Sequence, residues 1–401
     1  MAEIDFSISS IRKDLCEGTF SIQEFYKNVL ARCDRIAADY NLPLKLFRSD
    51  ALRRVEFLDI YRREGNIIGN IFGVPFAISA DLLEPNLGRE YNEYSKVPVI
   101  RRLLVEGAVL FCKLEINQDN LFIKLHKEVS ENSKFHFKEK LDKLNLISLT
   151  VLLGVVPIGF SCMRPEEWLN ELSFSNIIAY SPSREIIPHT GIRCENKKHE
   201  RLIFLGRSIE DLGKLCEELS GDDGTDTETL GVCKKRVFKN RFEHSKIGKR
   251  VLLIKSVSKD FPQYSNYMDS VSSKLEQKGM ILDTMEILDV FKKTRTIKKG
   301  EKNKIENSIE KISFDFSTIS SFALEIFKTC DVVLFLLSPT SCKYDELIES
   351  FFKCRNFPLL SVPFLIKNKS DILKIKFFFV GMEERDDILL QCGQSTLEDL
   401  Q

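Results

Sequence analysis

Apolar strands that directly follow amphipathic helices recur along this chain, and this alternation limits the possible fold more than any other feature. Residues 97–106 are typical of a helix with Pro98 in its first turn, Gly107 ends it, and residues 108–111 follow as a buried strand. Because helices between strands cover the faces of a sheet, the pattern predicts an α/β fold. We expect a single α/β/α domain over residues 1–401, with a large mixed, mostly parallel central sheet and helices on both faces.

Other segments extend this pattern. Ser21 and Glu24 have the spacing of a capping box, so the first helix is expected there, after an N-terminal segment of residues 1–20. Further helices are expected at residues 144–157, 208–219, 265–279 and 383–392. Strands are expected at residues 67–72, 76–78, 176–180, 251–254, 331–337, 357–364 and 374–380. Two polar stretches, residues 221–248 and 292–306, are expected to be exposed loops.

Composition excludes several classes of protein. The chain has 59 basic and 59 acidic residues, so its total charge provides no general attraction to nucleic acid or membranes. Eleven cysteines without a CxxC motif favour a reduced intracellular protein. Neither a secretory signal nor an apolar run of about 20 residues is found, which predicts a cytoplasmic protein, with an organelle as the alternative. Cys194 and His199 lack a second ligand pair, so we expect no metal and no cofactor.

A set of short motifs follows one another in a characteristic order. They are Gly73-Val-Pro-Phe-Ala-Ile78, Pro98-Val-Ile-Arg-Arg-Leu103, Glu106-Gly-Ala-Val-Leu110 with Lys113, Gly154-Val-Val-Pro-Ile-Gly159, Gly206-Arg-Ser-Ile-Glu-Asp211, Ser338-Pro-Thr340 and Leu360-Ser-Val-Pro363. Each motif is short, but their order over about residues 20–395 resembles the amidase signature family. This family includes the A subunit of glutamyl-tRNA amidotransferase, and the resemblance implies the amidase signature fold.

The resemblance also implies a catalytic site, and the chain departs from the family there. The family hydrolyses amides with a Ser–cis-Ser–Lys set whose serines lie in glycine-rich loops. Ser79 occupies the position of the lysine, and a serine hydroxyl is not a proton acceptor near neutral pH. The two loops fall on residues 143–147 and 161–165, and Pro165 has no N–H to donate. The only glycines between residues 125 and 188 are Gly154 and Gly159, so neither loop is rich in glycine. We therefore expect no catalytic residues and no enzymatic activity.

The leading hypothesis from the sequence is a catalytically inactive amidase-like protein retained as a binding or structural component of a protein or ribonucleoprotein assembly. In the family, the A subunit works with two others, a tRNA-binding subunit plus a small wrapping subunit, so the resemblance implies protein partners. An alternative is a divergent A subunit of a tRNA-dependent amidotransferase, with residual or partner-dependent amide transfer. Neither DNA nor a membrane is expected as a partner.

A second alternative is an RNA- or ribosome-binding factor. A basic segment with Phe238 and Phe242 interleaved has the residue types that neutralise phosphates and stack on bases. Its positive residues are Lys234, Lys235, Arg236, Lys239, Arg241, Lys246, Lys249 and Arg250. A further lysine-rich run occupies residues 292–304. The simpler interpretation is that both runs are solvated and balance the acidic residues 217–228.

Three side chains are candidates for a new nucleophile. Ser79 follows an apolar strand, and the thiols of Cys112 and Cys162 have three histidines as candidate partners: His126, His136 and His189. Spacing along the chain brings none of these groups together. A structural serine and buried cysteines that act as small apolar residues are the favoured interpretation.

Overall fold

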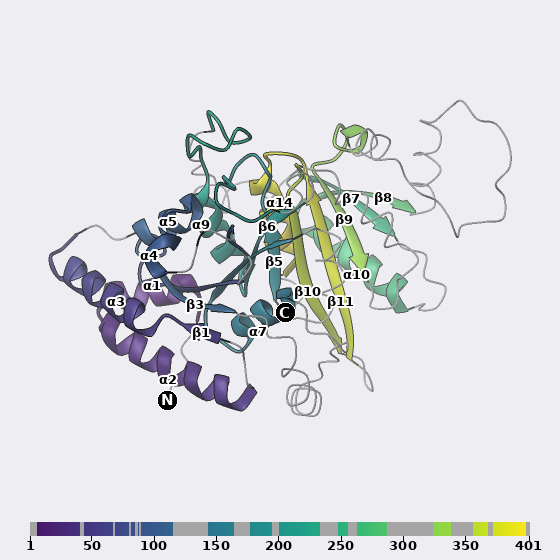
Figure 1. Cartoon of the computed structure of the whole chain (residues 1–401). Helices are drawn as coiled ribbons and strands as arrows, with labels where there is room; N and C mark the ends of the chain where they lie inside the picture. The colour runs from purple at the N-terminus through teal and green to yellow at the C-terminus, as the bar shows by residue number, and fades with distance from the viewer. Residues whose placement is uncertain are drawn as a thin grey trace. The chain divides into compact units, whose positions relative to one another are not determined.

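In the computed structural model, the helix expected after Ser21 is α2 (Ile22–Tyr40), and its capping box is formed (Figure 1). The Ser21 N–H donates to Glu24 Oε2 at 3.0 Å, and the Glu24 N–H donates to Ser21 Oγ at 3.1 Å. These two bonds satisfy N–H groups that the start of a helix otherwise leaves without partners. The predicted start of this helix is therefore confirmed.

The structure describes residues 6–40, 44–66, 69–79, 82–84, 87, 90–114, 143–163, 177–194, 200–232, 248–255, 263–286, 324–337, 356–367 and 372–397. The chain divides into two units, Met1–Lys239 and Asn240–Gln401. Each unit has its own set of strands and helices, and each is described separately below. The single domain expected from the sequence stays a prediction. The expected loop of residues 292–306 lies outside the described residues.

The described residues of the first unit form six strands in the order β1-β3-β2-β4-β6-β5. Their bounds are β1 (Leu44–Leu46), β2 (Pro75–Ser79), β3 (Val109–Leu114), β4 (Ile158–Met163), β5 (Ile178–Ser181) and β6 (Arg201–Gly206). Strand β2 pairs in parallel with both β3 and β4, whereas β1–β3, β4–β6 and β5–β6 are antiparallel. The carboxyl ends of β2, β3 and β4 therefore meet at one edge.

Helices cover both faces of this sheet. The described helices of the unit are α1 (Ile8–Glu17), α2, α3 (Arg48–Arg63), α4 (Tyr91–Tyr94), α5 (Pro98–Val105), α7 (Lys143–Leu152) and α9 (Ile209–Leu219), and α2 and α3 lie side by side in Figure 1. A Cβ on Gly159 would meet Ile147 of α7, whereas a Cβ on Gly206 would meet Leu212 of α9. Gly206 is paired with Ile158, the neighbour of Gly159, so α7 and α9 lie on opposite faces.

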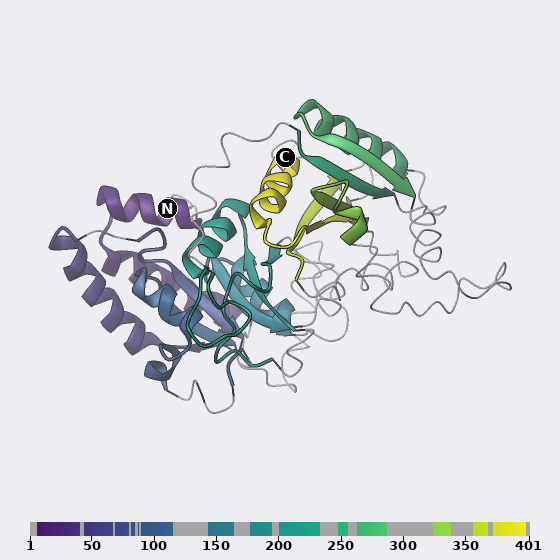
Figure 2. The same ribbon diagram turned by 90° about the horizontal axis from the view of Figure 1, so that it is seen from above.

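In the second unit, five strands lie among the described residues, in the order β10-β11-β9-β7-β8. Their bounds are β7 (Arg250–Lys255), β8 (Ile281–Glu286), β9 (Val332–Leu337), β10 (Leu359–Lys367) and β11 (Ile372–Gly381). Helix α14 (Asp386–Leu397) packs on β9, β10 and β11, and Figure 2 shows α10 (Gln263–Gln277) running along the β7–β8 pair. Strand β7 is parallel to β8 and β9, whereas β11 is antiparallel to β10 and β9.

The mixed α/β fold is confirmed, and the balance of strand directions corrects the expectation of a mostly parallel sheet. Of the strand pairings described inside the two units, four are parallel and five are antiparallel. The β10–β11 hairpin and the pairing of β6 with both β4 and β5 account for most of the antiparallel contacts. Apolar content predicts that a strand is buried, but it does not define the direction of its neighbours.

Several expected elements differ in extent. The N-terminal segment contains helix α1, which begins at the Ser7 cap and ends at Gly18 with φ of 72°. Helix α3 was also not expected, since its sequence is strongly charged. The helix expected at residues 144–157 ends at Leu152, because Gly154 adopts φ of 70°. Residues 70–72, expected to be part of a strand, form a turn.

No helix among the described residues combines the length and apolar character that crossing a bilayer requires. The cytoplasmic location stays a prediction.

Strand β11 carries a buried lysine. The Lys376 side chain is 7% exposed, and its Nζ has no hydrogen-bond partner among the described residues. Gly381 faces Leu389 of α14, so Lys376, five residues earlier on the strand, lies on the opposite face. Burial lowers the pKa of Lys376 well below its usual value, because the charged form loses its hydration.

We expect Lys376→Met to raise the free energy of unfolding at neutral pH by about 1–3 kcal/mol. The folded chain binds fewer protons than the unfolded chain between the lowered pKa of Lys376 and its usual value of 10.5. Stability of the unsubstituted protein therefore rises with pH in this window, and the variant should lose that rise. Denaturant unfolding at several pH values measures both effects. Lys328→Met, at an exposed position, is the control and should change the free energy of unfolding little. Equal effects of the two substitutions would contradict the assignment of Lys376 as a buried lysine without a partner.

Candidate functional site

Two serine hydroxyls meet at the carboxyl ends of the parallel strands. Ser79 is the last residue of β2, and Ser161 lies near the end of β4. The Ser161 hydroxyl donates to Ser79 Oγ at 3.3 Å, and the two residues are only 1% and 3% exposed. In α/β sheets this edge is where ligands bind, so the pair occupies the expected location of a site.

Strand register places the two serines on one face. Ala77 of β2 is aligned with Gly159 of β4, and Ser79 and Ser161 each follow two residues later. Successive residues of a strand alternate between faces, so both hydroxyls lie on the face that α7 covers. A Cβ at Gly159 would come within 2.7 Å of Ile147 Cγ1, which shows how closely α7 approaches the sheet there.

The backbone around Ser161 is engaged in the sheet. Ser161, Cys162 and Met163 pair with Ile203, Leu202 and Arg201 of β6 in an antiparallel ladder. Residues 143–147, where the sequence places the family's middle-serine loop, lie in helix α7. Residues 164 and 165 lie outside the described part of the chain. Within the described residues, the segments aligned with the family's two loops therefore adopt strand and helix conformations.

The serine pair by itself lacks a proton acceptor. Among the described residues, no basic side chain forms a hydrogen bond with either hydroxyl. A serine hydroxyl becomes a nucleophile when a neighbouring base accepts its proton. A reaction at this pair therefore requires a base from another source. The assignment of Ser79 as a structural rather than catalytic residue stays a prediction.

The cysteine candidates differ in their surroundings. Burial raises the pKa of the Cys112 thiol well above its usual value, which keeps the thiol protonated near neutral pH. Cys162 is half-buried, and its Sγ lies 3.4 Å from Cys194 Sγ. His126 and His136 lie outside the described residues.

His189 has a structural environment. Its Nδ1 lies 2.9 Å from the Ile187 carbonyl oxygen, and its Nε2 accepts from the Leu202 N–H at 3.4 Å. Burial, assisted by the charge of Arg184, lowers the pKa of His189 to about 3. The ring is therefore neutral at physiological pH, with both nitrogens directed at backbone groups.

The acidic loop after α9 is organised by its own carboxylates. Asp222 accepts from the N–H groups of Gly224 and Gly231, and Asp226 accepts from the His189 N–H at 2.8 Å. Arg184 forms ion pairs with Asp226 at 3.0 Å and with Glu228 at 3.2 Å. The sequence indicated only an exposed acidic loop. In the described residues 221–232 the tip at Gly224 is exposed, whereas Thr229 is buried.

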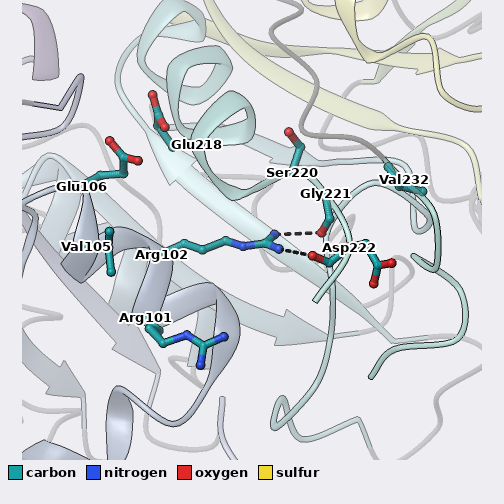
Figure 3. A pocket seen from close by; sticks show the side chains of 9 residues that line it. All are labelled: Arg101, Arg102, Val105, Glu106, Glu218, Ser220, Gly221, Asp222 and Val232. Atoms are coloured by element: carbon teal, nitrogen blue, oxygen red, sulfur yellow. Dashed lines mark hydrogen bonds between the residues drawn. The ribbon is translucent and has the colours of Figure 1, made fainter. Parts of the chain in front are cut away.

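A small pocket of about 260 Å³ lies beside the C-terminal end of α9 (Figure 3). Its lining residues are Arg101, Arg102, Val105, Glu106, Glu218, Ser220, Gly221, Asp222 and Val232. Arg102 donates to the carbonyl oxygens of Leu219, Gly221 and Asp222 at 2.5, 2.9 and 2.7 Å. Ligand sites usually exceed about 300 Å³. The N–H groups of the Arg102 guanidinium already donate to backbone carbonyl oxygens, so we assign a structural role to Arg102 in this pocket.

Of the basic segment, Lys249 and Arg250 lie among the described residues. Lys234, Lys235, Arg236, Lys239, Arg241 and Lys246 lie outside the described residues, as does the run at residues 292–304. Arg250 begins β7 with an exposed side chain, and its backbone N–H donates to Asp331 Oδ2 at 2.8 Å. Lys249 is half-buried. Binding of RNA or ribosomes by this segment stays a prediction.

Comparison with known proteins identifies relatives, although no protein-family model matches the chain. Over 242 residues the chain is 23% identical to the A subunit of glutamyl-tRNA(Gln) amidotransferase from Chlorobium chlorochromatii, covering 55% of this chain and 48% of that protein. Over 297 residues it is 18% identical to the A 2 subunit of glutamyl-tRNA(Gln) amidotransferase from Clostridium acetobutylicum, covering 70% and 61%. The matched region thus spans about half the length of these curated relatives.

Solved structures match nearly the whole chain. A peptide amidase from Stenotrophomonas maltophilia has a TM-score of 0.72 at 13% identity, with 99% of this chain and 97% of that chain covered. An amidase family protein from Bacillus anthracis has a TM-score of 0.68 at 14% identity, with 98% and 91% covered. At such identities the likeness shows the fold, which is that of amidase signature structures.

These findings confirm the resemblance to the amidase signature family and correct one prediction. The chain was expected not to be an enzyme because the family's lysine and both of its glycine-rich serine loops have no counterpart in the sequence. The relatives contradict this, since they are named as amidotransferase subunits and the structural neighbours as amidases. The prediction rested on the alignment of three short segments, whereas the named relatives point to an enzymatic function.

Asp226 should make the protein sensitive to acid. Burial alone would raise its pKa, but hydrogen bonds from the His189 N–H and Arg184 outweigh burial and hold the pKa below its usual value. The stability that Asp226 contributes is present above the usual value of 3.8 and is lost as pH falls through the lowered pKa. We expect Asp226→Asn to cost about 2–4 kcal/mol at pH 7 and to flatten the acid limb of the unfolding curve. Chemical unfolding from pH 7 to pH 2 measures this, with exposed Glu325→Gln as the control. An unchanged acid limb would show that Asp226 is not held ionised by these bonds.

Arg102 should stabilise the first unit through its carbonyl contacts. We expect Arg102→Met to lower the free energy of unfolding by about 2–3 kcal/mol, because it leaves the carbonyls that end α9 without their cationic donor. Arg101 lines the same pocket with an exposed side chain, so Arg101→Met is a matched control and should change stability by less than about 0.5 kcal/mol. Thermal and denaturant unfolding check both. Equal losses in the two variants would contradict the role of the carbonyl contacts.

Proposed function

We propose that this protein is a divergent relative of the amidotransferase A subunit that supports amide transfer together with partner chains. The observation that carries the proposal is its sequence similarity to several proteins named as the A subunit of glutamyl-tRNA(Gln) amidotransferase. The amidase signature fold over nearly the whole chain supports it. The proposed substrate class is an amide such as glutamine, whose nitrogen is released for transfer.

The serine pair supports a site at the expected edge of the sheet. Ser79 and Ser161 bring two hydroxyls together where β2 and β4 end, on the face covered by α7. Hydroxyls at 3.3 Å are close enough to pass a proton from one to the other. We propose that Ser161 Oγ attacks the amide carbonyl carbon and that Ser79 relays the proton, giving its own hydroxyl proton to a base as its oxygen takes the proton of Ser161.

Dependence on a partner follows from what the pair lacks. Within the described residues neither hydroxyl forms a hydrogen bond with a basic side chain, and we propose that the final proton acceptor comes with an associated chain. Both residues are at most 3% exposed, so substrate contacts them only after a local rearrangement. Binding of another chain can provide both the base and the rearrangement. The relatives are named as subunits, which is consistent with such an assembly.

The test is to purify the tagged full chain from its native organism at moderate salt and to identify all co-purifying proteins and RNA. Release of ammonia from glutamine is then measured with and without the co-purified chains. We expect release only in their presence, and a loss of at least about tenfold in Ser161→Ala. Ser273→Ala on α10 has an exposed side chain and is the matched control, expected to remain within about twofold.

Two results would overturn the proposal. One is recovery of the chain alone without any ammonia release from glutamine. The other is release that is equal in Ser161→Ala and the unsubstituted protein, provided that both have the same melting temperature. Recovery with RNA and without protein partners would instead favour the RNA-binding alternative.

A further inference from the structure

A second group of reactive side chains lies on the other face of β4 from Ser161. Cys162 is on β4, Cys194 follows the loop after β5, and Glu200 directly precedes β6. Their ligand atoms, two Sγ and one carboxylate oxygen, all lie within 4.8 Å of one another. All three side chains are half-buried, so they are neither sealed in the core nor fully hydrated.

The backbone holds these three residues in place from separate directions. Met163 of β4 pairs with Arg201 of β6, which puts Glu200 beside the end of β4. Ile192 forms a bridge with Leu83, and the Arg193 N–H donates to the Leu82 carbonyl oxygen at 2.9 Å. Cys194 is therefore only one residue from an anchored backbone position. The cluster is built by three segments rather than by one flexible loop.

The distances suit a thiophilic metal ion. With Zn–S bonds of about 2.3 Å and tetrahedral angles, two thiolates on one zinc lie about 3.8 Å apart. The Sγ atoms of Cys162 and Cys194 lie 3.4 Å apart, a few tenths of an ångström shorter. A disulfide requires about 2.05 Å, and both cysteines are in the thiol form in the structure. A small outward movement of either side chain admits the ion.

The ligand chemistry selects the class of metal. Two thiolates and one carboxylate are donors that Zn²⁺ accepts, whereas Mg²⁺ and Ca²⁺ require oxygen ligands. Three protein ligands leave one position of a tetrahedral ion for water or another group. We propose that Cys162, Cys194 and Glu200 form a zinc-type metal site that ties the end of β4 to the start of β6 and to residues 192–194.

This inference is independent of the proposed amide chemistry, and it differs from the expectation of no metal. That expectation rested on the spacing of Cys194 and His199, which offers no second ligand pair along the sequence. Cys162 is far from Cys194 in sequence, so spacing alone does not reveal the pair.

The test uses the full chain, reduced and freed of metal with a chelator. Co²⁺ is the spectroscopic probe, because Co²⁺ bound by thiolates has a near-ultraviolet charge-transfer band. We expect a band that saturates at one equivalent, displacement of Co²⁺ by Zn²⁺, and a rise in melting temperature on adding Zn²⁺. Cys194→Ser should abolish the band, and Glu200→Gln should weaken Zn²⁺ binding by at least about tenfold. Cys16→Ser removes an exposed thiol elsewhere and should change neither.

Several outcomes would overturn the site. They are the absence of a Co²⁺ band in the unsubstituted protein, a band that persists in Cys194→Ser, and a Cys162–Cys194 disulfide that forms in air while the reduced protein binds no metal. If Cys194→Ser fails to fold by circular dichroism, Glu200→Gln decides the question, because it keeps the size and shape of the side chain and removes its charge and one of its two acceptor oxygens.

Discussion

The close approach of helix α7 to the sheet at Gly159 is the contact on which the surroundings of the serine pair depend. A side chain larger than hydrogen at this position would collide with Ile147 of α7. Gly159 lies beside Ala77 of β2, so the two strands present small residues to the helix at the same level. Ser79 and Ser161 come next along each strand and are enclosed together. The burial of the hydroxyl pair is thus consistent with the close packing of α7 on this face of the sheet.

Two arginines, Arg102 and Arg184, hold the region after α9 in place. Arg102 supplies its guanidinium to the carbonyl groups at the C-terminal end of the helix, where the helix dipole favours positive charge. Arg184 and the neighbouring N–H groups neutralise the carboxylates of the following loop. Asp222 and Asp226 of the acidic stretch serve as hydrogen-bond acceptors inside their own loop and for the His189 N–H. A charge pattern therefore did not predict the partners of these groups.

The chain shares the fold of amidase signature structures at low sequence identity, and its sheet is built on buried apolar side chains. Ile78, Phe160 and Phe204 are buried, and the rings of Phe160 and Phe204 pack edge to face at 5.2 Å. Such residues can be exchanged for others of similar size, which explains how fold similarity persists at 13% identity. Catalytic groups have no comparable tolerance, because each must provide a particular pKa and geometry. The prediction of an inactive protein rested on residue identities at a few aligned positions, and the relatives named as amidotransferase subunits contradict it.

The sequence by itself determined the α/β class, the capping box of α2, the buried strands and the family resemblance, because periodicity, capping and apolar runs are local properties. The sequence analysis did not predict α1 and α3, in which charged residues interrupt the apolar pattern. It also predicted that the helix now labelled α7 extends to residue 157, whereas α7 ends at Leu152. Only the tertiary structure decided that Ser79 meets Ser161, that Arg184 binds Asp226, and that Cys162 lies beside Cys194. Each of these pairs joins residues at least 32 positions apart. Strand register and helix packing bring such residues together, and neither can be read from residue spacing in a single chain.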